Sequence, residues 1–283
     1  MFERIATGWE LMKQSFGVLR QDKELVVFPL LSGAACLAVL ASFALPLWNT
    51  TWFQQFFQDK QAPQDPLLYV LLFAFYVVNY FVIVFFNAAL VSCALKRLAG
   101  GDPTVSYGLK QASSRLPQIA AWAVVSATVG VVLKVIESKS QKIGQIVASL
   151  VGAGWAIATY FVVPILVVEQ VGPFAALKRS TSLMRRTWGE ALAGKMGLGL
   201  VIFGAMLPGI VLMMVGFAAA ASDYAVIAGL SIALGFVWIM GVSLVSSAVQ
   251  SILLTALYLY ASEGTAPPQF DAALLRGAFG SKR

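Results

Sequence analysis

Residues 225–261 read AVIAGLSIALGFVWIMGVSLVSSAVQSILLTALYLYA and contain no charged side chain. A helix needs about 20 apolar residues to cross the hydrocarbon core of a bilayer, which is about 30 Å thick. These 37 residues would form a helix about 55 Å long. Two crossings would need about 40 residues and a turn. We therefore predict one long membrane-spanning helix, either kinked near Gly241 or extending past the bilayer.

Five further apolar stretches are long enough to cross a bilayer, at about residues 25–48, 67–95, 118–136, 145–168 and 192–221. Charged residues make up 12% of the chain, against about 25% in soluble domains. Backbone groups find no water inside the bilayer, so each stretch must be helical, and none alternates apolar and polar residues as a β-barrel strand does. We predict an all-α fold, a polytopic bundle of six transmembrane helices that forms one membrane domain over residues 1–283.

Most basic residues lie in the two terminal segments and in every second connector. Of the 20 Lys and Arg residues, 16 fall on one side: in residues 1–24, in the second connector, in the fourth connector with Lys195 just after it, and in the tail at residues 262–283. Cytoplasmic loops carry an excess of Lys and Arg, so this count predicts that both termini lie in the cytoplasm. The first outer connector, residues 49–66, contains aromatic residues typical of a membrane interface.

The cytoplasmic segments are predicted to form amphipathic helices. In residues 2–19, apolar residues recur at intervals of three and four and share one helical stripe: Phe2, Ile5, Trp9, Met12, Phe16 and Leu19. Similar segments follow the second and fourth spans, where Asp102-Pro103 and Gly172-Pro173 are predicted helix starts. A shorter one follows the sixth span. Such helices lie in the membrane interface or pack on the cytoplasmic ends of the spans.

Short sequence echoes accompany these helices. Lys13-Gln14-Ser15, Lys110-Gln111-Ala112 and Lys178-Arg179-Ser180 occupy similar places, and residues 175–179 resemble residues 272–276. These echoes favour a unit of one interfacial helix and one transmembrane hairpin that is used three times, since internal duplication is common in membrane folds. The alternative is that any cytoplasmic loop is basic and half apolar.

Three motifs resemble a known family. They are Gly8-Trp9-Glu10-Leu11, Asp22-Lys23-Glu24-Leu25 and Phe28-Pro29-Leu30-Leu31-Ser32-Gly33, and they resemble a family of uncharacterised prokaryotic multi-pass membrane proteins. The segment Leu177-Lys178-Arg179-Ser180 is distantly similar to the membrane domain attached to some glycerophosphodiester phosphodiesterases. The phosphodiesterase domain is absent here, so its activity is not implied. The resemblance implies a prokaryotic inner-membrane protein without an established function.

The composition argues against an enzyme. The chain has no histidine, which removes the commonest general base and metal ligand. Its two cysteines, Cys36 and Cys93, are far apart in sequence, which argues against a disulfide framework or a zinc site. No Asp or Glu lies in the middle of a span. We expect no enzymatic activity, no cofactor, no metal and no nucleic-acid partner.

The candidate functional residues are uncharged polar groups within spans and basic groups beside them. Either packing between helices or a polar pathway would use Asn79, Asn87, Ser243, Ser247, Gln250 and Ser251. Contacts with anionic lipid headgroups would use Lys110, Arg115, Lys178, Arg179, Arg185 and Arg186.

Two functions remain open. The repeated basic helices favour a non-enzymatic membrane scaffold or membrane-organising protein, with membrane lipids as partners and the option of a homo-oligomer. The polar residues within spans favour a channel or transporter for a small solute or lipid. Broken helices can serve transport, and candidate breakers stand at Pro29, Pro46, Pro164 and Pro208-Gly209. We favour the scaffold.

Overall fold

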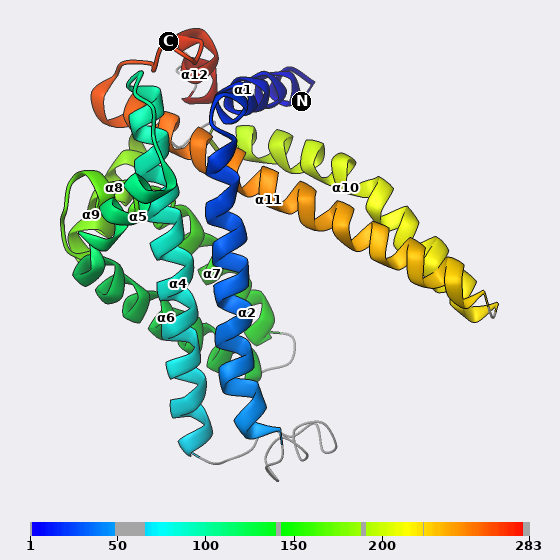
Figure 1. Cartoon of the computed structure of the whole chain (residues 1–283). Coiled ribbons are helices and arrows are strands. Elements are labelled where there is room, and N and C mark those ends of the chain that lie inside the picture. Colours follow the sequence, from blue (N-terminus) through cyan, green and yellow to red (C-terminus); the bar gives the residue numbers. More distant parts are fainter. Residues whose placement is uncertain (1, 49–65, 140–142, 188–190, 223, 280–283) are drawn as a thin grey trace. The chain divides into compact units, whose positions relative to one another are not determined.

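The computed structural model describes residues 2–48, 66–139, 143–187, 191–222 and 224–279 (Figure 1). Within these ranges the chain is helical and contains no β-strand. The elements are α1 (Phe2–Gln21), the 3-10 helix η1 (Lys23–Val26), α2 (Val27–Leu47), α4 (Pro66–Leu98), α5 (Val105–Ser113), α6 (Leu116–Lys139), α7 (Ile143–Ala158), α8 (Val162–Val168), α9 (Pro173–Thr187), α10 (Ala191–Ala221), α11 (Ala225–Glu263) and α12 (Ala272–Phe279).

Six segments of the described chain are long and apolar enough to cross a membrane: Lys23–Leu47, Val70–Leu98, Leu116–Glu137, Gly144–Val168, Val201–Ala221 and Ala225–Glu263. They coincide with the predicted spans, which confirms an all-α multi-pass membrane protein. The last segment, α11, is one helix of 39 residues, so the prediction of a single long helix is also confirmed. Nearly all of the predicted aromatic connector at residues 49–66 lies outside the described residues.

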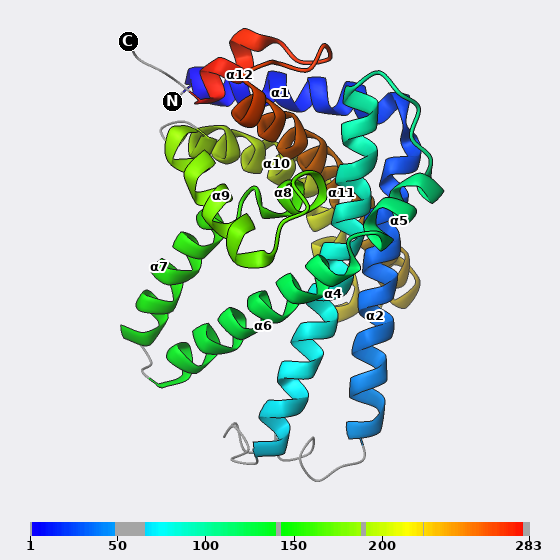
Figure 2. The same ribbon diagram turned by 90° about the vertical axis from the view of Figure 1, so that its left-hand side faces the viewer.

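The described chain forms two compact units that interleave along the sequence. The first unit holds α1, η1, the end of α4 from Ala94, α10, α11 and α12. In it, α10 and α11 lie side by side as a hairpin, and α1 packs on both (Figure 1). The second unit holds α2, α4 up to Cys93, α5 to α8, and α9 up to Met184. There α2 runs beside α4, and α6 forms a hairpin with α7 (Figure 2).

Glycines bring α10 and α11 into close contact. A Cβ added at Gly235 would lie 2.7 Å from the Gly209 carbonyl oxygen, so these two backbones touch at a point where no side chain fits. The Trp238 indole Nε1–H also donates to the Ala205 carbonyl across the seam, at 2.9 Å. Pro208 lies inside α10, which continues through it. The candidate breaker Pro208-Gly209 is therefore a close-packing site rather than a helix break.

The fourth span does break. Helix α7 ends at Ala158 and α8 begins at Val162, two residues before Pro164. A proline cannot donate to the carbonyl one turn earlier and crowds it, which favours a break there. The freed Phe161 amide donates to the Ser180 hydroxyl of α9 at 3.1 Å, and both residues are fully buried. By contrast Pro29 and Pro46 lie close to the two ends of α2, which is continuous.

Helix α1 buries a different face from the one predicted. Leu11, Ser15, Val18 and Leu19 are buried, whereas Trp9 and Phe16 of the predicted stripe are exposed. The reason is that α1 packs on α10 and α11 through a face with small or aliphatic side chains, which allow a close approach. Of the predicted stripe, Leu19 alone belongs to the buried face among the residues whose burial the structure describes.

Candidate functional site

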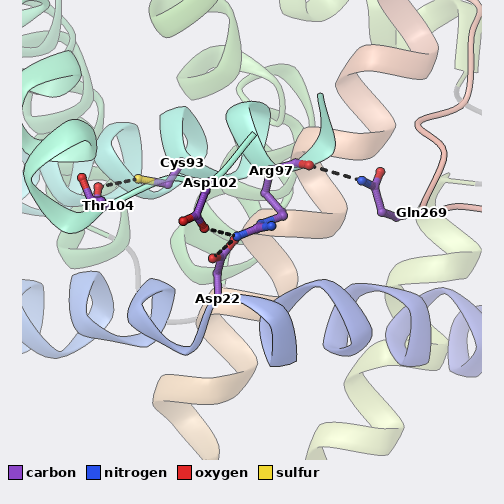
Figure 3. A network of polar contacts seen from close by, with 6 residues as sticks. All are labelled: Asp22, Cys93, Arg97, Asp102, Thr104 and Gln269. Atoms are coloured by element: carbon purple, nitrogen blue, oxygen red, sulfur yellow. Dashed lines mark hydrogen bonds and ion pairs between the residues drawn. The ribbon is translucent and has the colours of Figure 1, made fainter. Parts of the chain in front are cut away.

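A buried ion pair joins distant segments of the first unit (Figure 3). The Arg97 guanidinium donates through Nε and Nη2 to the two carboxylate oxygens of Asp22. Its Nη2 also lies 2.6 Å from Oδ1 of Asp102. Asp22 has 7% of its side chain exposed and Arg97 17%, whereas Asp102 is 87% exposed. The pair of Asp22 and Arg97 is thus the internal part of the network, and Asp102 closes it on the solvent side.

Local structure places these three side chains. Asp22 stands between α1 and η1, where its carbonyl accepts the Leu25 amide of the 3-10 turn. Arg97 lies in the last turn of α4, where a cation is favoured by the negative end of the helix dipole. The chain then turns through Gly100, whose φ of 85° suits glycine. This turn returns Asp102 to Arg97.

The same turn corrects the predicted start of α5. Asp102 does not cap this helix, because its carboxylate binds Arg97. The N-cap is Thr104, whose hydroxyl accepts the Tyr107 amide at 3.2 Å. Figure 3 also shows the Cys93 thiol donating to the Thr104 carbonyl, within the second unit. The other predicted start is confirmed, since α9 begins at Pro173.

The segment after α11 joins the network. The Gln269 amide Nε2 donates to the Arg97 carbonyl at 3.2 Å, while its Oε1 is buried and accepts no hydrogen bond. The Asp271 amide donates to Gln14 Oε1 of α1, also at 3.2 Å. This network therefore ties α1, the end of α4 and the segment leading to α12. The network serves to hold these segments together, because each of its charged groups already has an opposite charge beside it.

Helices α1, α5 and α9 share a register of burial. Lys13, Lys110 and Lys178 are all exposed, and two residues later Ser15, Ala112 and Ser180 each have 0% exposure. One turn before those buried small residues stand Leu11, Gly108 and Ala176, which are buried in all three helices. The echoed tripeptides therefore occupy equivalent positions. The echo in α12 does not extend to burial, because Leu275, which aligns with Lys178, is fully buried.

Each of these helices packs on a hairpin through the shared face. Helix α1 packs on α10 and α11. In α5, a Cβ at Gly108 would lie 2.6 Å from Cζ of Phe28 and 2.9 Å from the Ala89 carbonyl, so α5 packs on α2 and α4. In α9, Ser180 binds Phe161 between α7 and α8.

Two of the predicted polar residues within the spans donate hydrogen bonds to carbonyls of their own helices. Asn79 Nδ2 donates to the Phe75 carbonyl at 3.3 Å, and Ser243 Oγ donates to the Ile239 carbonyl at 2.7 Å. Ser247 and Ser251 are half-buried, as is Asn87, while Gln250 is exposed. One turn after Ser251 in α11, Thr255 is fully buried, and its hydroxyl donates to the Ser251 carbonyl.

The predicted basic residues divide into two groups. Lys110, Lys178 and Arg185 are exposed. Arg115 Nε donates to the Val167 carbonyl at 3.4 Å, and Arg179 Nε lies 3.0 Å from Oε1 of Glu169. The side chain of Arg186 lies outside the described residues. Of the five predicted basic side chains that the structure describes, the protein itself therefore engages two, Arg115 and Arg179.

Sequence reasoning missed the ion pair of Asp22 and Arg97. Asp22 belongs to the motif Asp22-Lys23-Glu24-Leu25 and Arg97 to the basic second connector, but no spacing relates two residues that are 75 positions apart. A signal did exist, since an acid just before a span needs a partner when it is buried.

Comparison with known families now places the chain. The model of the family of unknown function DUF6159 matches residues 67–267. The chain belongs to DUF6159. The matched region of this DUF6159 protein contains Arg97 and Asp102, whereas Asp22 and Gln269 lie outside it. No curated protein matches the chain. Among the described residues, no group of three or more His, Cys, Asp or Glu side chains could hold a metal ion.

Proposed function

We propose that this protein is a non-enzymatic membrane-organising protein of the prokaryotic inner membrane, with both termini in the cytoplasm. Its helices α1, α5 and α9 lie at the cytoplasmic interface and gather anionic lipids through their exposed basic side chains. The observation that carries this proposal is the shared register of Lys13, Lys110 and Lys178, each exposed on the opposite side of its helix from buried small residues.

The orientation of polar side chains within the spans favours this function over transport. A transport pathway would present polar atoms to a shared water-filled cavity. Instead, the side chains of Asn79, Ser92, Thr128 and Ser243 donate to carbonyls one turn earlier in their own helices. Such bonds satisfy these four donors within their own helices rather than in a shared cavity.

A threefold repeat of interfacial helix and hairpin explains the shared register. In repeat order, α5 packs on the first hairpin, α2 and α4, while α9 contacts the second hairpin at Phe161, between α7 and α8. Helix α1 packs on the third hairpin, α10 and α11. Each interfacial helix thus contacts the preceding hairpin in a cyclic order. One ancestral contact, repeated three times, would produce this pattern.

The exposed cations match an anionic membrane surface. Each Lys or Arg close to such a surface contributes about 1 kcal/mol, and salt screens the interaction. Lys110, Lys178 and Arg185 are the predicted contacts that the protein leaves exposed. Together they could enrich phosphatidylglycerol around the protein by up to about 100-fold in the limit of full additivity.

The test is lipid enrichment in liposomes that contain the purified protein. Energy transfer from the labelled protein to fluorescent phosphatidylglycerol should exceed that to fluorescent phosphatidylcholine. The triple variant Lys110→Gln, Lys178→Gln, Arg185→Gln should lose most of this preference. Lys134→Gln is the matched control, since Lys134 is exposed but predicted to face the opposite side.

Solute flux tests the alternative. The same liposomes should conduct no ions above the level of protein-free liposomes. A flux that Asn79→Ala or Ser247→Ala abolishes, in protein that still folds, would replace the organising function by a channel. An unchanged lipid preference in the triple variant would remove the role of α5 and α9.

A further inference from the structure

The apolar side chains of α1 are divided between two faces. The inner face, Leu11, Ser15, Val18 and Leu19, is buried against α10 and α11. The outer face carries Trp9, which is 43% exposed, and Phe16, which is 36% exposed. A helix that merely covered other helices would need only the inner face. Large aromatic rings on the outer face call for a second apolar partner.

Cations accompany both exposed rings. Lys13 Nζ lies 5.5 Å from the centre of the Trp9 ring, and Arg20 Cζ lies 5.0 Å from the centre of the Phe16 ring. This combination of an aromatic ring and a long basic side chain is favoured at the boundary of a bilayer, because the ring contacts the acyl region while the cation reaches the headgroups.

The position of α1 in the chain places this helix next to segments that are apolar and long enough to cross a membrane. Helix α1 ends at Gln21, and an apolar segment long enough to cross a membrane begins at Lys23. The inner face is held by α10 and α11, which include two further apolar segments of this kind. Helix α1 is therefore attached to apolar segments of membrane-spanning length at its C-terminal end and along its inner face.

The structure also changes the charge of this segment. In the sequence, the four acids of residues 1–24 balance its four bases. In the folded protein, however, the Asp22 carboxylate is buried and paired with Arg97. Of the acids, Glu10 lies beside the outer face, 2.9 Å from Lys13, while Arg20 carries a further positive charge there. The outer face is thus more basic than the sequence indicates.

We propose that the outer face of α1, formed by Trp9, Met12, Lys13, Phe16 and Arg20, inserts into the headgroup layer of the bilayer and binds anionic lipid. The rings of Trp9 and Phe16 enter the boundary with the acyl chains. Lys13 and Arg20 bind lipid phosphates. This inference rests on the proposed function, which already counts Lys13 of α1 among the exposed cations that gather anionic lipid. It adds the insertion of the two rings and the role of Arg20, and it uses none of the basic residues of α5 and α9.

Photo-crosslinking tests the insertion. Benzoyl-phenylalanine replaces Trp9 or Phe16 in the full-length protein in nanodiscs of phosphatidylcholine and phosphatidylglycerol, and mass spectrometry counts lipid adducts. Gln21 is the matched control, because it is exposed on the same helix but points about 120° or more away from both rings at about 100° per residue. We expect at least fivefold more lipid adducts at positions 9 and 16. Equal yields at all three positions would overturn the insertion, as would adducts to protein alone at positions 9 and 16.

A second pair of variants tests the choice of lipid. The double variant Lys13→Gln, Arg20→Gln should reduce the share of phosphatidylglycerol among adducts at position 16 by threefold or more, whereas Lys23→Gln, an exposed base beyond α1, should leave it unchanged. An unaltered share in the double variant would overturn the binding of anionic lipid by this face.

The outcome is separable from that of the proposed function. If adducts at positions 9 and 16 are normal but the whole protein shows no preference for anionic lipid, the organising function fails and the insertion stands. If the preference is normal and depends on Lys110, Lys178 and Arg185 while position 16 forms no lipid adducts, the insertion fails and the organising function stands.

Discussion

The α10–α11 hairpin and the α7–α8 segment both contain a proline, yet only one of them breaks. At Pro208, α10 continues, and Gly209 and Gly235 let α11 approach so closely that Trp238 reaches the Ala205 carbonyl. At Pro164 the helix is interrupted, and the freed Phe161 amide is satisfied by Ser180. A proline in a span thus does not determine a break. Whether the helix breaks depends on the contacts and hydrogen bonds that the neighbouring helix provides to the backbone groups near the proline.

The two units also differ in how they join distant segments. In the first unit, the buried Asp22 is paired with Arg97, whereas at the helix break of the second unit a neutral hydroxyl, that of Ser180, accepts the buried Phe161 amide. Arg97→Gln should therefore have the largest effect on stability, about 3–5 kcal/mol, because it leaves the buried Asp22 charge without its partner. Thermal unfolding in detergent, followed by circular dichroism, measures the loss. The exposed Arg185 offers the control Arg185→Gln, and similar losses in both variants would contradict the buried role of Arg97.

Gly235→Leu should cause the next largest loss of stability, about 3 kcal/mol, because overpacking forces α10 and α11 apart. Even the Cβ would lie 2.7 Å from the Gly209 carbonyl oxygen and 3.0 Å from the Met213 amide nitrogen. The same change at Gly229, also in α11, should be tolerated, since nothing lies within 4 Å of its Cβ. Size-exclusion profiles and unfolding temperatures of the two variants compare them directly. If Gly229→Leu were as harmful as Gly235→Leu, the close seam would be wrong.

Ser180→Ala should cost about 1–3 kcal/mol, because it removes the hydroxyl that accepts the buried Phe161 amide. Its neighbour Thr181 donates to carbonyls of its own helix, so Thr181→Ala should change stability by less than about 0.5 kcal/mol. Unfolding midpoints of the two variants give the difference. A silent Ser180→Ala would mean that the break at Pro164 does not depend on α9.

Trp238→Phe should have a smaller effect, about 1 kcal/mol, because it removes one hydrogen bond across the seam and keeps an aromatic ring. The neighbouring Phe236, which is 55% exposed, provides the control Phe236→Leu. Hydrogen exchange of the α10 amides after Ala205 should increase in Trp238→Phe alone. No change there would show that glycine packing suffices at Pro208.

Ser243→Ala should have the smallest effect, below about 0.5 kcal/mol, since this exposed hydroxyl donates to the Ile239 carbonyl of its own helix. Unfolding midpoints and liposome flux should both match those of the unaltered protein. A change in flux with normal folding would indicate that this part of α11 lines a pathway.

The six spans and the all-α class could be predicted because they depend on local physics. A chain segment in lipid must satisfy its own backbone hydrogen bonds, so length and apolarity are enough to predict a helix. The single long helix α11 followed from the same argument, as its 39 residues exceed one crossing and fall short of two. The positions of Lys13, Lys110 and Lys178 were likewise visible as echoes in the sequence.

The candidate site and the faces of the helices could not be predicted in this way. Apolar periodicity in α1 identified a stripe that includes Trp9 and Phe16, but the buried face is centred on Leu11, Ser15 and Val18. Which face is buried depends on α10 and α11, about 200 positions further along the chain. The pairing of Asp22 with Arg97 and of Phe161 with Ser180 has the same origin. A membrane-spanning helix depends on local properties of the chain, namely its length and apolarity. These contacts, by contrast, form only when remote segments pack together.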